Sequence, residues 1–318
     1  MNITKISSLF TFTISILFSC ISCTSQENGL IDLVKVKRVN LAFMGVQPAY
    51  DLALIGDYAF VSSNKQIVSI SISDPENASK VGFVEIPGPC FGLYSHENLL
   101  FAVGEPGLII IDPTDPENPQ VIGRYEEQGY SHQVRVTAQH AYVATDRGVQ
   151  VIDVSDCNCP KYLRTLNSDH VYGIEIHGDM LLAGYKNIGM ITYDISNPAA
   201  IRELSKHPAQ GGVIMSDKDN DRLFSCSGQG IVINNIFGKT ISEKLGTYSP
   251  DQELRSIFAN DQYLFVGEIV GVEIVDISTP ELPVKVAEYD KLRNLHELIA
   301  RNHYIYITDG SGFYILCY

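Results

Sequence analysis

The residues with the clearest chemical potential lie at equivalent places in a repeated pattern. His132 and His296 are separated by four steps of 41 residues, Arg255 stands one step before His296, and Glu297 directly follows it. Histidine titrates near neutral pH, so two imidazoles and a carboxylate could perform acid/base chemistry or hold a metal ion. An arginine beside them would suit a carboxylate or phosphate group. His132, His296 and Glu297 are therefore the candidate catalytic residues.

Two rows of residues at this spacing would open successive strands. The first row is Tyr50, Phe91, His132, Gly173, Ile214, Arg255 and His296, and the second is Asp51, Gly92, Gln133, Ile174, Met215, Ser256 and Glu297. The predicted binding funnel consists of Tyr50, Asp51, Phe91, His132, Gln133, Arg255, His296 and Glu297, with Tyr130, His170 and Glu253 just upstream. The alternative is that a solvated channel mouth simply tolerates polar side chains.

The elements that must position these residues follow from the repeat itself. Steps of 41 residues from Gly107 reach further glycines, each before a short apolar run: Gly148, Gly189, Gly230, Gly271 and Gly312. Aromatic residues recur in another phase, as Phe60, Phe101, Tyr142, Phe224, Phe265 and Tyr306. Within one unit, four runs of strand-forming residues are separated by turn residues: Phe91 to Ser95, Leu99 to Val103, Leu108 to Ile111 and Gln120 to Tyr125. Four short strands in a period near 40 predict the blade of a β-propeller.

Each third strand is followed by a run such as Asp276-Ile-Ser-Thr-Pro280, which ends the strand. The carboxylate and hydroxyl groups can bind nearby backbone amides, and proline cannot continue a ladder. The acidic residues could instead suggest calcium, but they lack the spacing of a calcium loop. The unit at 230–238 departs from the pattern at the aspartate and the proline, so a different turn is expected there.

The third strand with its turn, as in Val149-Gln-Val-Ile-Asp-Val-Ser-Asp156, resembles the LVIVD-repeat proteins. The resemblance covers about residues 36–318 and implies a bacterial or archaeal β-propeller, often secreted or surface-attached, with no settled activity. We predict an all-β fold with seven four-stranded blades. The last copy ends after its third strand at Tyr318, so Val39 to Phe43 at the N-terminus is expected to supply its fourth strand.

The N-terminal segment is expected to direct export. Lys5 is followed by an apolar run too short to span a membrane, and Leu17-Phe-Ser-Cys20 resembles the lipidation signal of bacterial lipoproteins, with Cys23 as the other candidate. We predict a signal peptide at 1–22, cleaved before Cys20 or Cys23, a tether at 23–35, and a propeller at 36–318. The alternative is an ordinary signal peptide with incidental cysteines.

The formal net charge is -14 with no basic run, which makes nucleic acid an unsuitable partner. Cys157-Asn-Cys159 stands where other units carry Asp-Pro and is interpreted as a turn variant; a strained disulfide or a soft-metal site is the alternative. No catalytic sequence motif or phosphate-binding glycine loop occurs, and we predict no cofactor and no metal site.

These observations predict a monomeric lipoprotein of the outer membrane, on its periplasmic or cell-surface face. It would be a non-enzymatic module that binds or scaffolds a protein or glycan partner, since rigid rings carry variable loops on one rim. The alternative function is an enzyme of the hydrolase or lyase type, with a site in the central funnel for a small anionic or sugar substrate.

Overall fold

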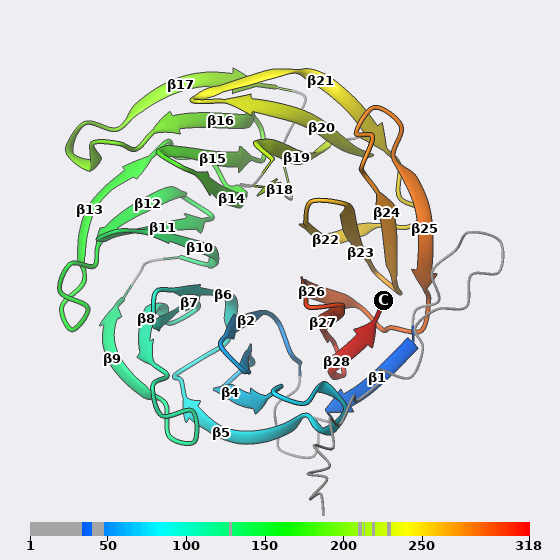
Figure 1. The fold of residues 1–318 in the computed structure, drawn as a ribbon. Helices are drawn as coiled ribbons and strands as arrows, with labels where there is room; N and C mark the ends of the chain where they lie inside the picture. Colours follow the sequence, from blue (N-terminus) through cyan, green and yellow to red (C-terminus); the bar gives the residue numbers. More distant parts are fainter. Residues whose placement is uncertain are drawn as a thin grey trace, which may run out of the picture.

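The protein is an all-β ring of seven antiparallel sheets, each with four strands (Figure 1). This computed structural model describes residues 34–39, 48–126, 129–208, 212, 214–217, 220–227 and 230–318. The first strand of each sheet lies nearest the ring centre, and the sheets are arranged around it like blades (Figure 1). The predicted seven-bladed propeller is therefore confirmed.

The strands follow one another outward within each blade. Blades 1 and 2 consist of β2 (Leu52–Ile55), β3 (Tyr58–Ser62), β4 (Gln66–Ser71) and β5 (Ser79–Glu85), and of β6 (Cys90–His96), β7 (Leu99–Gly104), β8 (Gly107–Asp112) and β9 (Gln120–Tyr125). Blades 3 and 4 consist of β10 (Ser131–Thr137), β11 (His140–Thr145), β12 (Gly148–Asp153) and β13 (Lys161–Leu166), and of β14 (Val171–His177), β15 (Met180–Tyr185), β16 (Gly189–Asp194) and β17 (Arg202–His207). Blades 5 and 6 consist of β18 (Ile214–Asp217), β19 (Arg222–Ser227), β20 (Gly230–Phe237) and β21 (Thr240–Tyr248), and of β22 (Leu254–Ala259), β23 (Tyr263–Glu268), β24 (Val272–Asp276) and β25 (Val284–Tyr289).

Blade 7 combines both ends of the described chain. Its inner strands are β26 (Leu295–Arg301), β27 (Tyr304–Asp309) and β28 (Gly312–Cys317), and its outer strand is β1 (Val34–Val39). In the antiparallel register of β1 and β28, Val34 lies opposite Cys317 and Val39 opposite Phe313. The outer strand thus lies earlier in the sequence than the expected Val39 to Phe43, of which all but Val39 falls outside the described residues. It also begins within the segment 23–35 that was expected to be a tether.

Apolar side chains from neighbouring blades form the cores between them. One such core joins Phe101 and Leu108 of blade 2 to Val134 and Val143 of blade 3. The aromatic residues in register on the second strands are almost completely buried: Phe60, Phe101, Tyr142, Phe224, Phe265 and Tyr306. Their recurrence in the sequence therefore reflects one packing position that is repeated between blades.

The turns after the third strands have the hydrogen bonds expected from their sequences. The carboxylates of Asp112, Asp153 and Asp276 accept the backbone N–H two residues later, at 2.8–2.9 Å. Two of the turns contain short 3-10 helices, η2 (Pro75–Asn77) and η3 (Pro198–Ala200). These turns also contact the preceding blade, because a Cβ atom on the fourth-strand Gly82, Gly123 or Gly246 would overlap a carbonyl oxygen of the next blade's turn.

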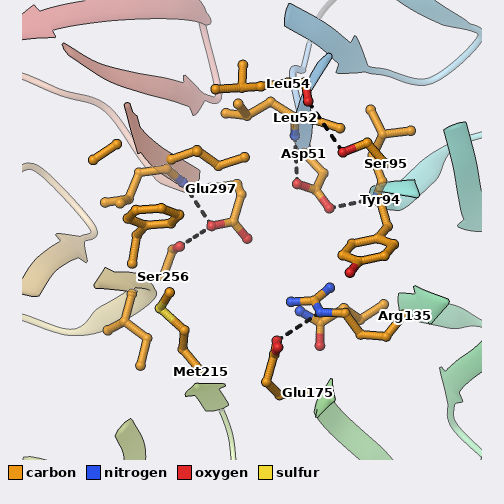
Figure 2. Close-up of a pocket in the computed structure, with 18 of the residues that line it drawn as sticks. Asp51, Leu52, Leu54, Tyr94, Ser95, Arg135, Glu175, Met215, Ser256 and Glu297 are labelled. Atoms are coloured by element: carbon orange, nitrogen blue, oxygen red, sulfur yellow. Dashed lines mark hydrogen bonds and ion pairs between the residues drawn. The ribbon is translucent and has the colours of Figure 1, made fainter. Parts of the chain in front are cut away.

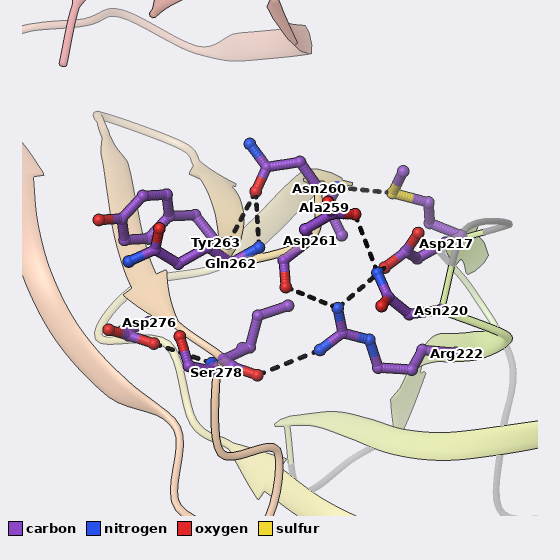
Figure 3. Close-up of polar contacts among 12 residues, drawn as sticks. Asp217, Asn220, Arg222, Ala259, Asn260, Asp261, Gln262, Tyr263, Asp276 and Ser278 are labelled. Atoms are coloured by element: carbon purple, nitrogen blue, oxygen red, sulfur yellow. Dashed lines mark hydrogen bonds and ion pairs between the residues drawn. The ribbon is translucent and has the colours of Figure 1, made fainter.

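Blade 5 has a different connection, as its sequence indicates. Gly238, with a φ of 58°, and Lys239 form a two-residue turn between β20 and β21, and the Lys239 ammonium is paired with Asp194 of blade 4. On its other side, the buried Arg222 donates to the carbonyl oxygens of Ile277 and Asp261 in blade 6, at 3.1 and 2.8 Å (Figure 3). Specific polar contacts thus attach this blade to both of its neighbours.

Candidate functional site

The inner strands share a bulge at the place where the sequence predicts a channel mouth. The pairing register shifts by one residue in β6, β10, β14, β22 and β26, and the extra residues are Phe91, His132, Tyr172, Arg255 and His296. A bulge redirects its side chain and interrupts the ladder. Four of these five residues belong to the first predicted row; in blade 4 the bulged residue is Tyr172 and not Gly173.

The exception in blade 4 has a local cause. The turn between Tyr185 and Gly189 is one residue longer than the equivalent turn between Thr145 and Gly148. The extra residue lies after the inner strand, so that strand starts 40 residues after its counterpart in blade 3, although the next glycine keeps the spacing of 41. Gly173 is therefore equivalent to Gln133, and Glu175 is equivalent to Arg135.

Beyond the bulges, the inner strands surround a cavity of about 510 Å³ (Figure 2). All seven blades contribute to its walls. This volume is in the range that holds a small molecule. Of the eight predicted funnel residues, Asp51, Gln133 and Glu297 line the cavity.

Asp51 and Gln133 connect neighbouring blades inside the ring. Asp51 Oδ2 accepts the backbone N–H of Leu93 in blade 2 at 2.7 Å, and Gln133 Oε1 accepts that of Ile174 in blade 4, also at 2.7 Å. The inner edge of a first strand has no further strand beside it, so its N–H groups need other acceptors. These two side chains therefore have a structural role that accounts for their polarity.

Two carboxyl groups lie close to each other on one side of the cavity. Glu297 Oε1 accepts the hydroxyl of Ser256 and the backbone N–H of Leu298, the latter at 2.9 Å, whereas Asp51 Oδ1 accepts the N–H of Leu52 at 2.6 Å. Burial and the neighbouring Glu297 charge raise the pKa of Asp51 well above its ordinary value, and burial also raises the pKa of Glu297.

An ion pair lies on the opposite side of the cavity. Arg135 Nε donates to Glu175 Oε2 at 2.9 Å, and its guanidinium carbon lies 5.1 Å from the centre of the Tyr94 ring (Figure 2). Burial opposes the charge of Arg135, but Glu175 outweighs this effect and the pKa of the guanidinium is raised. The sequence analysis missed Arg135, Glu175 and Tyr94 because they lie two residues beyond the second row.

One half of the mouth is an aromatic cluster. The Tyr50 ring lies edge-on to Phe91, with 5.0 Å between ring centres, and edge-on to His296 at 5.7 Å. His296 Nε2 is 2.9 Å from the side-chain nitrogen of Asn294. Burial, together with the nearby Arg255, lowers the pKa of His296, so its imidazole is neutral at neutral pH.

The other half is a second cluster of rings. His132 and His170 have ring centres 5.0 Å apart, and His170 lies 4.9 Å from the ring of Tyr172, which is 50% exposed. Burial and the neighbouring His170 lower the pKa of His132. Arg255 is paired with Glu253 at 3.2 Å and stays outside the cavity wall.

The three candidate catalytic residues do not form one hydrogen-bonded group in the described part of the chain. His132 lies in one ring cluster and His296 in the other, whereas Glu297 is bonded to Ser256 and the backbone. General acid/base catalysis requires the acid and base to reach one substrate together. The geometry thus offers surfaces and hydrogen-bonding groups for binding, and it gives no specific support to the hydrolase or lyase alternative.

The remaining metal and cysteine candidates have ordinary contacts. Asp251, Glu273 and Glu288 come close enough to share a cation, and the Lys285 ammonium already lies between them, at 2.7, 3.2 and 2.7 Å. Cys157 and Cys159 are free thiols, and the Cys157 thiol donates to the carbonyl oxygen of Val154 at 3.3 Å. Cys157-Asn-Cys159 is therefore a reduced variant of the turn in this structure.

Comparison with known proteins supports the repeat and the fold. The family model described as "LVIVD repeat" matches residues 48–85, 128–162 and 254–291, within blades 1, 3 and 6. The crystal structure of the computationally designed Ika8 protein is similar with a TM-score of 0.62 and 9% identity, over 85% of this chain and 83% of that chain. No curated protein shows significant similarity. Within the described ranges, no helix has the length and apolar character needed to cross a membrane. The chain is thus a seven-bladed propeller with LVIVD repeats, a fold that serves generally for binding or scaffolding.

Proposed function

We propose that this LVIVD-repeat propeller is a non-enzymatic binding module of the cell envelope that holds a glycan at the channel mouth. The observation that carries the proposal is the pair of ring clusters at the mouth, next to a cavity with polar groups of both signs. Sugars present apolar C–H faces together with many hydroxyl groups. Aromatic rings can cover the faces, while convergent donors and acceptors bind the hydroxyls.

A glycan fits the described surface better than a protein partner does. Protein interfaces are centred on contiguous apolar patches. The large exposed hydrophobic residues away from the mouth are spread over blades 1, 3, 5 and 6, as Phe83, Tyr162, Leu163, Phe237, Val270, Leu282 and Val284. At the mouth, by contrast, the rings of Tyr50, Phe91, His132, His170, Tyr172 and His296 gather around one opening.

The proposed location depends on the leader, which lies outside the described residues. A lipid on Cys20 or Cys23 would attach the ring to the outer membrane by a short segment of chain. Such an anchor would keep the mouth near envelope glycans, whose local concentration is high.

The test is a glycan-binding screen with the purified protein and two tyrosine variants. Tyr172→Ala removes a half-exposed ring from the mouth, whereas Tyr162→Ala removes one of similar exposure, 47%, from the outer strand of blade 3. We expect specific glycan binding that weakens about tenfold with Tyr172→Ala and is unchanged with Tyr162→Ala, on the scale of base stacking on aromatic side chains. Absence of binding to any glycan, with capture of an envelope protein that depends on Tyr172, would replace the glycan by a protein partner.

A further inference from the structure

The cavity beyond the mouth contains more negative than positive groups. Three carboxyl groups face it, from Asp51 on β2, Glu175 on β14 and Glu297 on β26, whereas Arg135 on β10 supplies the guanidinium. The lining side chains from β18 and β22 are uncharged, and Tyr94 on β6 carries a neutral phenol. Arg301 also lines the cavity, but its guanidinium lies over the Tyr306 ring, 6.0 Å from the ring centre.

The internal pairing leaves two of these carboxyl groups without a cation. Glu175 is paired with Arg135, so the two charges compensate each other. Asp51 and Glu297 receive hydrogen bonds from backbone N–H groups and from a hydroxyl, which stabilise the carboxylates but do not neutralise them. A buried charge is costly unless it is paired. In the absence of a ligand, bound protons can compensate for this charge, which agrees with the raised pKa of both groups.

We propose that the sugar that enters the cavity carries a positively charged amine, so that the protein recognises an unacetylated amino sugar. This inference rests on the proposed glycan-binding function and names the ligand class for it. The ammonium group would lie beside Asp51 and Glu297, where it replaces the protons and forms charge-assisted hydrogen bonds. The net charge of -14 would also favour the approach of a cationic glycan.

The rest of the cavity suits a sugar ring better than a bare metal ion. Arg135 and Tyr94 can donate to hydroxyl groups on the side opposite the two carboxyls (Figure 2). Met215, Phe258 and Ile299 form an apolar stretch of the wall, against which C–H groups can pack. Calcium would instead need six to eight oxygen ligands around one point.

The experiment compares three oligosaccharides with the same β-1,4-linked glucose backbone. Trimers of chitosan, chitin and cellulose carry an ammonium, an acetamide and a hydroxyl group at carbon 2, respectively. Calorimetric titration of the full protein at pH 6 is expected to show at least tenfold tighter binding of the chitosan trimer. Binding should also release protons, measured as a dependence of the heat on the buffer's ionisation enthalpy.

Two variants separate recognition in the cavity from general attraction to an acidic protein. Glu297→Gln keeps an oxygen that can accept the bonds from Ser256 and Leu298, and it should abolish the preference for chitosan and reduce the proton release. Glu281→Gln makes the same change of charge at an exposed position in blade 6 and should change neither. Equal losses in both variants would overturn the inference, as would calcium binding that depends on Glu297 and displaces the chitosan trimer.

The outcomes also distinguish the inference from the function on which it rests. Equal affinity for the three trimers, with binding still dependent on Tyr172, would refute the role of the amine and leave glycan binding in place. No binding of these trimers, together with a negative glycan screen, would refute both.

Discussion

Substitution of Gly92 by alanine tests whether the inner strands are held together as closely as the site requires. Gly92 follows the bulged Phe91 and lies against blade 3. A Cβ atom at this position would be 2.6 Å from the carbonyl oxygen of His132 and 2.9 Å from the Cα of Gln133. Both are backbone atoms, and Cβ contacts below 3.0 Å are essentially never found. The clash can therefore be relieved only by moving one blade relative to the other.

The expected cost is at the upper end for overpacking in a well-packed interior, about 3 kcal/mol. At about 2 °C for each kcal/mol in a protein of this size, the melting temperature should fall by about 6 °C. Gly92 does not have a positive φ, so the loss would come from the contact and not from backbone strain. The displaced segment carries His132 and Gln133, so glycan binding at the mouth should weaken as well.

Gly88→Ala is the matched control. It lies four residues earlier, also without a positive φ, and its nearest contact for an added Cβ is an ordinary 3.6 Å, to Pro106 Cδ. We expect no loss of stability, or a gain of up to about 1 kcal/mol from the stiffer unfolded chain. Thermal unfolding followed by circular dichroism gives both values. A Gly92→Ala protein that melts within about 1 °C of the Gly88→Ala protein would refute the close approach of the two blades.

Three further predictions concern charge and attachment. Glu297→Gln should raise the melting temperature at pH 8 but not at pH 4: because burial raises the pKa of this carboxyl in the folded state, the stability of the parent protein falls as pH rises from the ordinary carboxyl pKa to the raised one, and an equal shift at both pH values would contradict this. Arg135→Met should cost about 3 kcal/mol because it leaves Glu175 without its cation, and the double variant with Glu175→Gln should recover most of that loss in chemical denaturation; an additive loss would show that the two side chains act independently. In cells fed a labelled fatty acid, either Cys20→Ser or Cys23→Ser should abolish labelling of the protein, and an unlabelled parent protein would indicate an ordinary signal peptide.

The architecture could be predicted from the sequence because it depends on features that recur in several registers at once. Glycines, buried aromatic residues such as Phe101 and Phe265, and turn-forming aspartates all follow the same spacing. The bulge positions in five blades lie at or beside the first predicted row for the same reason. The fixed spacing was wrong in blade 4, where the longer turn before Gly189 moves the inner strand by one residue and brings Tyr172, not Gly173, to the mouth.

The chemistry of the cavity could not be predicted from those rows, because it depends on differences between blades and not on what they share. Arg135 and Glu175 are equivalent residues on adjacent inner strands, at a register where other blades carry Ala53, Phe258 and Ile299. Their pairing needs the 40-residue step of blade 4, since a constant step of 41 would place Ile176 beside the arginine. A search of every inner-strand register for charged residues, with the turn lengths allowed to vary, would have found this pair. It would also have shown that Asp51 and Glu297 face the same cavity without a cation of their own, which is the imbalance from which the amino-sugar inference follows.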